Sequence, residues 1–250
     1  GFFTSEEDIN SHASQELYFA SNTGKWLPGD IKFKDLNKDG VIDYGTYKVD
    51  DPGDRKVIGN STPRYSYGIS LHADWNGIFF SAFVQGVGRQ NWWPGSDNAL
   101  FWGQYNRPYN NIPSSMIGNI WTEDNPNAYF PRYRGYVALS DTRELSVAQT
   151  RYLQNVAYMR LKNLQVGYNL PKGWLSFIKM QNARIYISAE NLWCWSPLYK
   201  HSRDFDVANI YGQDTDIKDT DTNTNNYNNG RQVYNYPVLK SFSAGLSVIF

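Results

Sequence analysis

The C-terminal stretch, residues 236–250, alternates polar with apolar side chains and ends on a phenylalanine. Because successive side chains of a β-strand point to opposite faces, every second residue of this stretch shares a face. One face is apolar and carries Phe242, Ala244, Leu246, Val248 and Phe250. The other carries Ile249 and otherwise small residues, Ser241, Ser243, Gly245 and Ser247. A strand of this kind suits either a soluble β-sandwich or a barrel in a membrane.

Charge and hydropathy narrow the classes of partner and of membrane protein. Twenty-four basic residues balance twenty-four acidic ones, so nothing in the charge predicts nucleic acid as a partner. The longest strongly apolar stretch lies near residues 77–84, far short of the roughly 20 residues that a membrane helix needs. A helical membrane protein is therefore not expected.

Aromatic residues are abundant, and cysteine is not. Nineteen tyrosines and nine tryptophans suit the two interfacial girdles of a membrane barrel, although carbohydrate-binding proteins are also rich in aromatic residues. Cys194 is the single cysteine, so the chain cannot form an internal disulfide. We interpret it as a small apolar residue of a strand.

Five strands are predicted, at residues 64–75, 78–87, 151–170, 183–195 and 236–250. The first two alternate clearly, and Asn76-Gly77 between them supplies the positive φ angles of a tight hairpin turn. In the third, the apolar phase changes between Leu161 and Leu164, which predicts a β-bulge. All five strands have two faces of different polarity.

The connections between these strands alternate in length. Short ones at residues 76–77 and 171–182 alternate with long ones at residues 88–150 and 196–235. Antiparallel strands would place the short turns and Phe250 on one side and the long loops on the other, as in outer-membrane barrels. Five strands cannot close such a barrel, so we expect this chain to be a piece whose missing strands precede Gly1. The alternative is a sandwich with long loops, which compact domains seldom carry.

Several motifs, in order along nearly the whole chain, resemble the C-terminal third of SusC-like TonB-dependent transporters. They lie at residues 29–43, 54–60, 63–68, 83–86, 158–168 and 189–192. The resemblance implies an all-β fold, the C-terminal antiparallel strands of a barrel of about 22 strands in the bacterial outer membrane. It divides the chain into an extracellular loop region, residues 1–62, and the strands and loops of the barrel, residues 63–250.

The resemblance also implies a function for the parent protein. Such transporters import oligosaccharides or peptides, use energy delivered through TonB, and pair with a SusD-like surface lipoprotein that closes over the barrel. The resemblance further implies that the terminal strand acts as an assembly signal, carried by Phe242, Leu246, Val248 and Phe250. We expect Phe242, Leu246 and Val248, with Tyr65, Tyr67, Ile69 and Leu71, to face lipid. The inward-facing residues are then Arg64, Asp74, Arg184 and Glu190.

One segment has the spacing of a calcium loop. Side-chain oxygens of Asp35, Asn37, Asp39 and Asp43, with the carbonyl of Val41, occupy positions 1, 3, 5, 9 and 7 of such a loop. Gly40 allows the sharp turn. The twelfth position, normally a bidentate glutamate, is Thr46, for which Asp50, Asp51 or Asp54 would have to substitute. The sequence therefore predicts calcium as the cofactor, with a metal-free loop built on Asx turns as the alternative.

Aromatic residues crowd the first long loop. We expect exposed rings of Trp92, Trp93, Trp102 and Tyr105 to stack on sugar or to contact the lid protein; packing within the loop and the outer girdle is the alternative. Catalysis is not expected, because the three histidines sit in no metal or triad spacing and neither HExxH nor GxSxG occurs. A different outer-membrane barrel and a secreted β protein that binds carbohydrate remain the two other functional hypotheses.

Overall fold

The computed structural model describes residues 1–15, 25–95, 98–106, 109, 111–139, 143–177, 179–210 and 238–250. These residues form two compact units. The first contains residues 1–59 and 93–153, and the second contains residues 60–92, 154–210 and 238–250.

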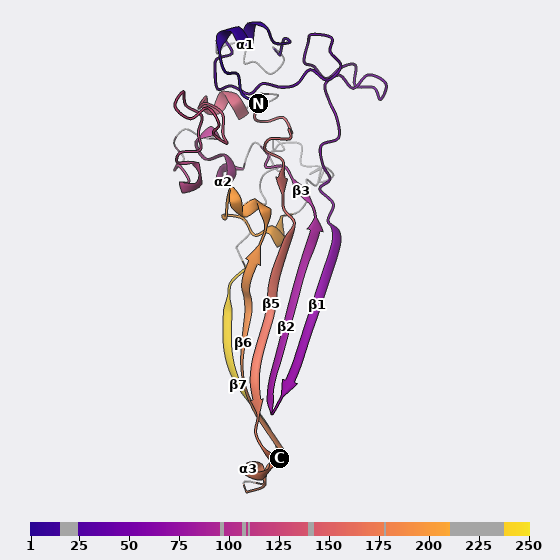
Figure 1. The fold of residues 1–250 in the computed structure, drawn as a ribbon, viewed down its shortest axis with the longest axis vertical. Coiled ribbons are helices and arrows are strands. Elements are labelled where there is room, and N and C mark those ends of the chain that lie inside the picture. The colour runs from indigo at the N-terminus through magenta and orange to yellow at the C-terminus, as the bar shows by residue number, and fades with distance from the viewer. Residues whose placement is uncertain are drawn as a thin grey trace, which may run out of the picture. The chain divides into compact units, whose positions relative to one another are not determined.

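The second unit is an antiparallel sheet of five strands. The strands are β1 (Arg64–Trp75), β2 (Ile78–Arg89), β5 (Tyr158–Asn169), β6 (Asn182–Trp195) and β7 (Ser241–Ile249), in the order β1-β2-β5-β6-β7. Each strand thus lies beside the next long strand along the chain (Figure 1). The all-β antiparallel fold predicted from the sequence is confirmed. Within the described residues β1 pairs only with β2 and β7 only with β6, so the sheet is open at both edges.

The third predicted strand is shorter than expected. β5 begins at Tyr158, whereas alternation was predicted from residue 151. Upstream of it, β4 (Gln154–Asn155) pairs with β3 (Asn91–Trp92) in a separate two-stranded ladder. The predicted fifth strand begins at Ser241, and residues 236 and 237 lie outside the described residues.

The hairpin between β1 and β2 has the predicted turn. Asn76 and Gly77 adopt φ angles of 52° and 87°, the left-handed conformation that a two-residue turn requires and that Asn and Gly adopt most readily. The Asn169 amide of β5 donates to the Gly77 carbonyl over 2.7 Å. The turn is therefore tied to the third strand as well.

The predicted bulge is also present. On β5, Leu161 and Asn163 pair with the consecutive residues Val84 and Phe83, so that Lys162 is the extra residue. Towards β6 the register shifts again at the same place, where Asn191 adopts a φ of 53°. The change of apolar phase seen in the sequence follows from this inserted residue.

One face of the sheet is apolar across all five strands. Register partners place the apolar side chains in rows that cross the strands. One row is Leu71, Ala82, Leu164, Ala189 and Phe242, and the next contains Ala73, Phe80, Val166, Ile187 and Ala244. Many of these side chains are solvent-exposed, with Leu71 at 52% and Ile187 at 64%. The apolar face therefore has no cover within the described chain.

The ends of this apolar face carry aromatic rings. Tyr65 and Tyr67 on β1, with Trp193 and Trp195 on β6, lie towards the long connections. Trp75 and Tyr168 lie towards the short ones. The rows in the middle of the face are mostly aliphatic, with Phe80 and Phe242 as their aromatic members.

The opposite face is polar. Its rows contain Ser70, His72, Asp74, Ser81, Gln85, Gln165, Ser188, Glu190 and Ser243. Its aromatic residues cover glycines on the neighbouring strand: a Cβ on Gly167 would lie 2.4 Å from the Phe79 ring, and one on Gly245 would lie 2.3 Å from the Tyr186 ring. These rings replace the packing that the glycines lack.

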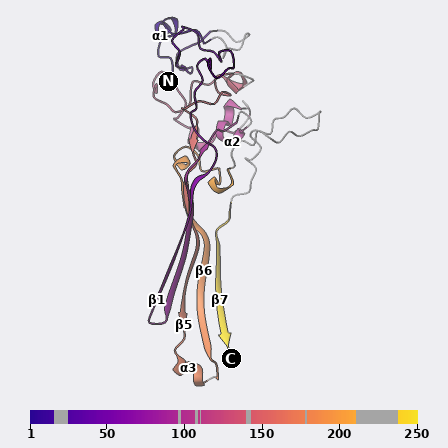
Figure 2. The same ribbon diagram turned by 90° about the vertical axis from the view of Figure 1, so that its right-hand side faces the viewer.

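The connections of the sheet lie where their lengths predict. The short connection between β5 and β6 contains α3 (Lys172–Phe177), and the C-terminus lies at the same end of the sheet (Figures 1 and 2). The Gln181 amide donates to the Ile249 carbonyl over 2.8 Å, which ties the terminus to that end. The predicted return of the chain to the side of the short turns is confirmed.

The first unit consists mainly of loops with short helices. These are α1 (Glu6–Asn10), α2 (Ala99–Trp102), η2 (Gly103–Tyr105), η3 (Ser114–Met116) and η4 (Gly135–Leu139). In the second unit, η5 (Pro197–Lys200) and η6 (Val207–Asn209) follow β6. In the part of the chain that is described, no helix combines the length and the apolar character needed to span a membrane.

Candidate functional site

The four aromatic residues expected at the surface are buried. Trp92 and Trp93 are each 8% exposed, and Trp102 and Tyr105 are 0% exposed. Trp92, in the second unit, packs against Phe205 with 5.0 Å between ring centroids. A ring without exposed surface cannot stack on a sugar. The expectation of exposed rings is therefore wrong, and these side chains act as packing groups.

The buried rings of the first unit form a connected cluster. Trp102 donates from Nε1 to the carbonyls of Pro94 and Gly95, over 3.2 and 3.1 Å, which satisfies its only polar atom. Tyr105 stacks on Phe130 with 5.8 Å between centroids. Its hydroxyl donates to the Pro131 carbonyl, and burial raises the pKa of Tyr105. The loop thus has an aromatic core of its own.

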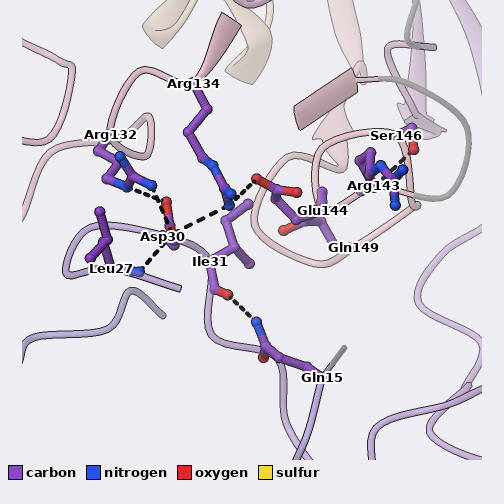
Figure 3. Close-up of polar contacts among 10 residues, drawn as sticks. All are labelled: Gln15, Leu27, Asp30, Ile31, Arg132, Arg134, Arg143, Glu144, Ser146 and Gln149. Carbon is purple, nitrogen blue, oxygen red and sulfur yellow. Dashed lines mark hydrogen bonds and ion pairs between the residues drawn. The ribbon is translucent and has the colours of Figure 1, made fainter. Parts of the chain in front are cut away.

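A buried ion cluster joins distant segments of the same unit (Figure 3). The Asp30 side chain is fully buried and accepts from Arg132 Nε at 2.5 Å and Nη2 at 3.2 Å. Arg134 Nη1 lies 3.3 Å from Asp30 Oδ2 and 3.2 Å from Glu144 Oε1. Paired with two arginines in this way, the buried Asp30 charge is tolerated. Glu144 is less well satisfied, because its Oε2 has no hydrogen-bond partner among the described residues.

Sequence reasoning missed this cluster, because its partners lie about a hundred positions apart in the chain. A hint was available at Gly29, which has a φ of 89° and whose missing Cβ leaves room for the Trp121 ring. The Gly29 carbonyl accepts from the Arg132 amide over 2.9 Å. The Gly-Asp motif is thus a docking point for the segment that carries Arg132. Its role is structural.

The loop with calcium spacing is ordered by its own carboxylates. Asp35 accepts from the amides of Lys38 and Gly40, and Asp39 accepts from the Val41 amide over 2.8 Å. Asp43 accepts from the Gly45 amide over 2.7 Å. These are the Asx turns of the metal-free alternative.

Asp54 closes the loop from outside its repeat. Its two carboxylate oxygens accept from the amides of Leu36 and Asp43. Asn37 turns its amide nitrogen towards Asp39, 2.8 Å away. Among the described residues no three acidic, histidine or cysteine side chains lie close enough together to hold a metal ion. The arrangement does not fit calcium as it stands, and calcium stays a prediction.

The terminal residues proposed as an assembly signal lie at an open edge. Phe242 and Leu246 of β7 are 71% and 66% exposed on the apolar face, and Val248 pairs with Ala183. Phe250 follows the strand and is 76% exposed. Their lipid contact and their role in assembly stay predictions.

A pocket of about 630 Å³ lies in the second unit, beside the ends of β6 and β7. A buried charged pair lines it, because Arg160 Nη2 donates to Asp206. Asp206 also accepts from the amides of Ala208 and Val238, over 3.0 and 3.1 Å. Although burial opposes it, hydrogen bonding from Arg160 and these amides lowers the pKa of Asp206. No pattern in the sequence predicted this pocket.

No family model matches the chain. Curated relatives nevertheless cover most of it. TonB-dependent receptor P3 of Formosa agariphila is 29% identical over 238 residues, which cover 92% of this chain and 20% of the receptor. TonB-dependent receptor P26 of the same organism is 24% identical over 253 residues, covering 99% of this chain and 22% of the receptor. The chain therefore spans about one fifth of the length of these relatives.

Solved structures of the RagAB peptide transporter are also similar. One is 25% identical with a TM-score of 0.44, covering 60% of this chain and 16% of the solved chain. The importer in its open-open state is 24% identical with a TM-score of 0.44, covering 71% and 18%. The curated receptors are what confirm the family resemblance seen in the motifs: along nearly its whole length, this chain is related in sequence to a segment of TonB-dependent receptors.

Proposed function

We propose that this chain forms part of the wall of a TonB-dependent barrel in the bacterial outer membrane, within a protein that imports nutrients. The observation that carries the proposal is the register of the sheet, which aligns uncovered apolar side chains over all five strands. Such a face is unstable in water but suits hydrocarbon. The polar face then lines an aqueous interior.

The open edges of the sheet support the same proposal. In a bilayer every backbone N–H and C=O must be paired within the protein, so a spanning sheet must close on itself. β1 and β7 each lack a second partner among the described residues. Further strands of the parent protein would pair with these two edges.

We propose oligosaccharides as the cargo, a SusD-like surface lipoprotein as the partner, and TonB as the source of energy, reached through another part of the parent protein. The names of the relatives support dependence on TonB, and the similar solved structures are those of RagAB, a peptide importer. Peptide is therefore the competing cargo. The role is transport and not catalysis, in keeping with relatives that are named receptors.

The test uses the full-length protein that contains this chain, in its native cells. Membrane fractionation, affinity purification in detergent and uptake of labelled oligosaccharides are compared between cells with and without TonB. We expect the protein in the outer membrane, a co-purifying lipoprotein, and uptake that stops without TonB. A product that folds and remains soluble without detergent would contradict the proposal and favour the secreted carbohydrate-binding protein.

A further inference from the structure

The pocket beside β6 and β7 has a polar floor. Arg160 and Cys194, which line it, are register partners on the polar face of the sheet. The connection that follows β6 lies against them, since the Tyr199 hydroxyl donates to Cys194 Sγ over 3.6 Å. If the polar face lines the barrel interior, as proposed above, the pocket borders the path of the cargo.

The charges of the pocket are unbalanced. Arg160 is matched by Asp206, the acidic residue of the lining. Lys200, Arg203 and Lys240 also line the pocket, and none of them forms an ion pair with a described residue. Within the described part of the chain, three cationic side chains therefore face the same space without a counter-charge, which favours an anionic ligand.

A hydrogen-bond acceptor in the lining also lacks a donor. The Asn191 side chain donates from Nδ2 to the Leu239 carbonyl over 3.1 Å, while its Oδ1 is buried without a hydrogen-bond partner in the described residues. A buried acceptor that is left unpaired destabilises the folded state. Asn191 therefore contributes to the lining a polar side chain that is only partly hydrogen-bonded within the described residues.

The connection after β6 adds the rings of Tyr199 and Phe205 to the lining. A cavity with apolar rings and a few convergent polar groups is the usual form of a small-molecule site. We propose that this pocket binds an acidic saccharide unit, one that carries a carboxylate or a sulfate ester beside free hydroxyl groups. The proposal rests on the proposed import function and specifies the chemistry of its cargo.

The experiment measures binding calorimetrically on the full-length protein in detergent. The probes are a uronic acid tetrasaccharide, its carboxyl-reduced neutral form, a sulfated neutral tetrasaccharide and an aspartate tetrapeptide. The double variant K200Q/K240Q is compared with K56Q/K172Q, which removes two exposed lysines that do not line the pocket. All four lysines are exposed, so neither change disturbs a core.

We expect the acidic tetrasaccharide to bind about tenfold more weakly to K200Q/K240Q than to the parent protein. K56Q/K172Q should bind like the parent, and added salt should weaken binding. The carboxyl-reduced form should bind more weakly than the acidic one. Comparison with the sulfated probe distinguishes which of the two anionic groups the pocket prefers.

Binding of the reduced tetrasaccharide that is as tight as that of both anionic tetrasaccharides, absence of binding, or an equal loss in both double variants would overturn the proposal. Tighter binding of the aspartate peptide would overturn the saccharide class. Binding to purified protein does not depend on where the protein resides in the cell. Calorimetry therefore tests ligand binding by the pocket on its own, and membrane fractionation separately tests the proposed import function.

Discussion

At the scale of single residues, Asp54 holds the loop that has calcium spacing. Both its oxygens accept backbone N–H groups, from Leu36 and from Asp43. Asp54→Ala should weaken the protection of these two amides by about 1–3 kcal/mol, because each is left without its acceptor. Hydrogen exchange measures the change, and Asp50→Asn, at an exposed carboxylate in the same segment, is the control.

The same measurement bears on the predicted calcium site. A loop held by these hydrogen bonds should exchange at equal rates in CaCl₂ and in EGTA. Slower exchange of residues 35–46 in CaCl₂ would show instead that the side chains rearrange around the ion, as the spacing of the carboxylates predicts.

Glu144 makes the first unit sensitive to pH. Burial raises the pKa of its carboxyl, even though Arg134 lies 3.2 Å away and opposes the shift. The folded state therefore holds the proton more tightly than the unfolded chain does. The contribution of Glu144 to the stability of the folded state is fully present below its ordinary pKa of 4.5. This contribution is lost as the pH rises through the folded-state pKa.

Glu144→Gln removes this titration. Relative to the variant, the wild type should gain stability as the pH falls from neutral towards 4.5, the ordinary pKa of this carboxyl. Exchange of the Leu145 amide reports the change through its bond to the Ala138 carbonyl. A difference between the two proteins that does not change with pH would contradict the assignment.

At the scale of elements, pairs of aromatic residues and glycines fix the packing on the polar face of the sheet. A Cβ at Gly167 would lie 2.4 Å from the Phe79 ring and 2.5 Å from the Ile185 carbonyl oxygen. Gly167→Ala should therefore lower the free energy of unfolding by about 1–3 kcal/mol. Urea unfolding of the full-length protein in detergent measures this. Gly173→Ala in α3 is the control, because a Cβ there meets nothing within 4 Å, and equal effects of both changes would refute the packing.

The strands were predictable from the sequence because the features that specify a strand lie within a few residues of one another. A side-chain period of two, the Asn76-Gly77 turn and the phase change near Lys162 each leave a mark within a few residues. The contacts of the long loop leave no such mark. Asp30 meets Arg132 across a hundred positions, and aromatic composition alone does not distinguish a buried Trp102 from an exposed one. The loop core and the pocket were therefore beyond sequence reasoning.

At the scale of the whole molecule, assembly in the membrane should depend on the terminal aromatic residue. Phe250 is exposed beyond β7, so its removal costs no core packing. Deleting it should lower the amount of protein in the outer membrane several-fold, while Phe250→Tyr, which keeps a ring, should not. Quantitative immunoblotting of membrane fractions measures both. Unchanged levels after the deletion would reject the predicted assembly signal.

The proposed function depends above all on the apolar face of the sheet contacting lipid while the polar face contacts water. Spin labels on single cysteines at residues 242, 243, 244, 246 and 247 of the full-length protein, in a Cys194→Ser background and in lipid vesicles, test this orientation; Gly245 is left unlabelled because a Cβ there would meet the Tyr186 ring. We predict that accessibility to oxygen and to a water-soluble nickel complex alternates: Phe242, Ala244 and Leu246 favour oxygen, and Ser243 and Ser247 favour nickel. Uniform access of the nickel complex to all five positions would contradict the orientation and, with it, the membrane barrel.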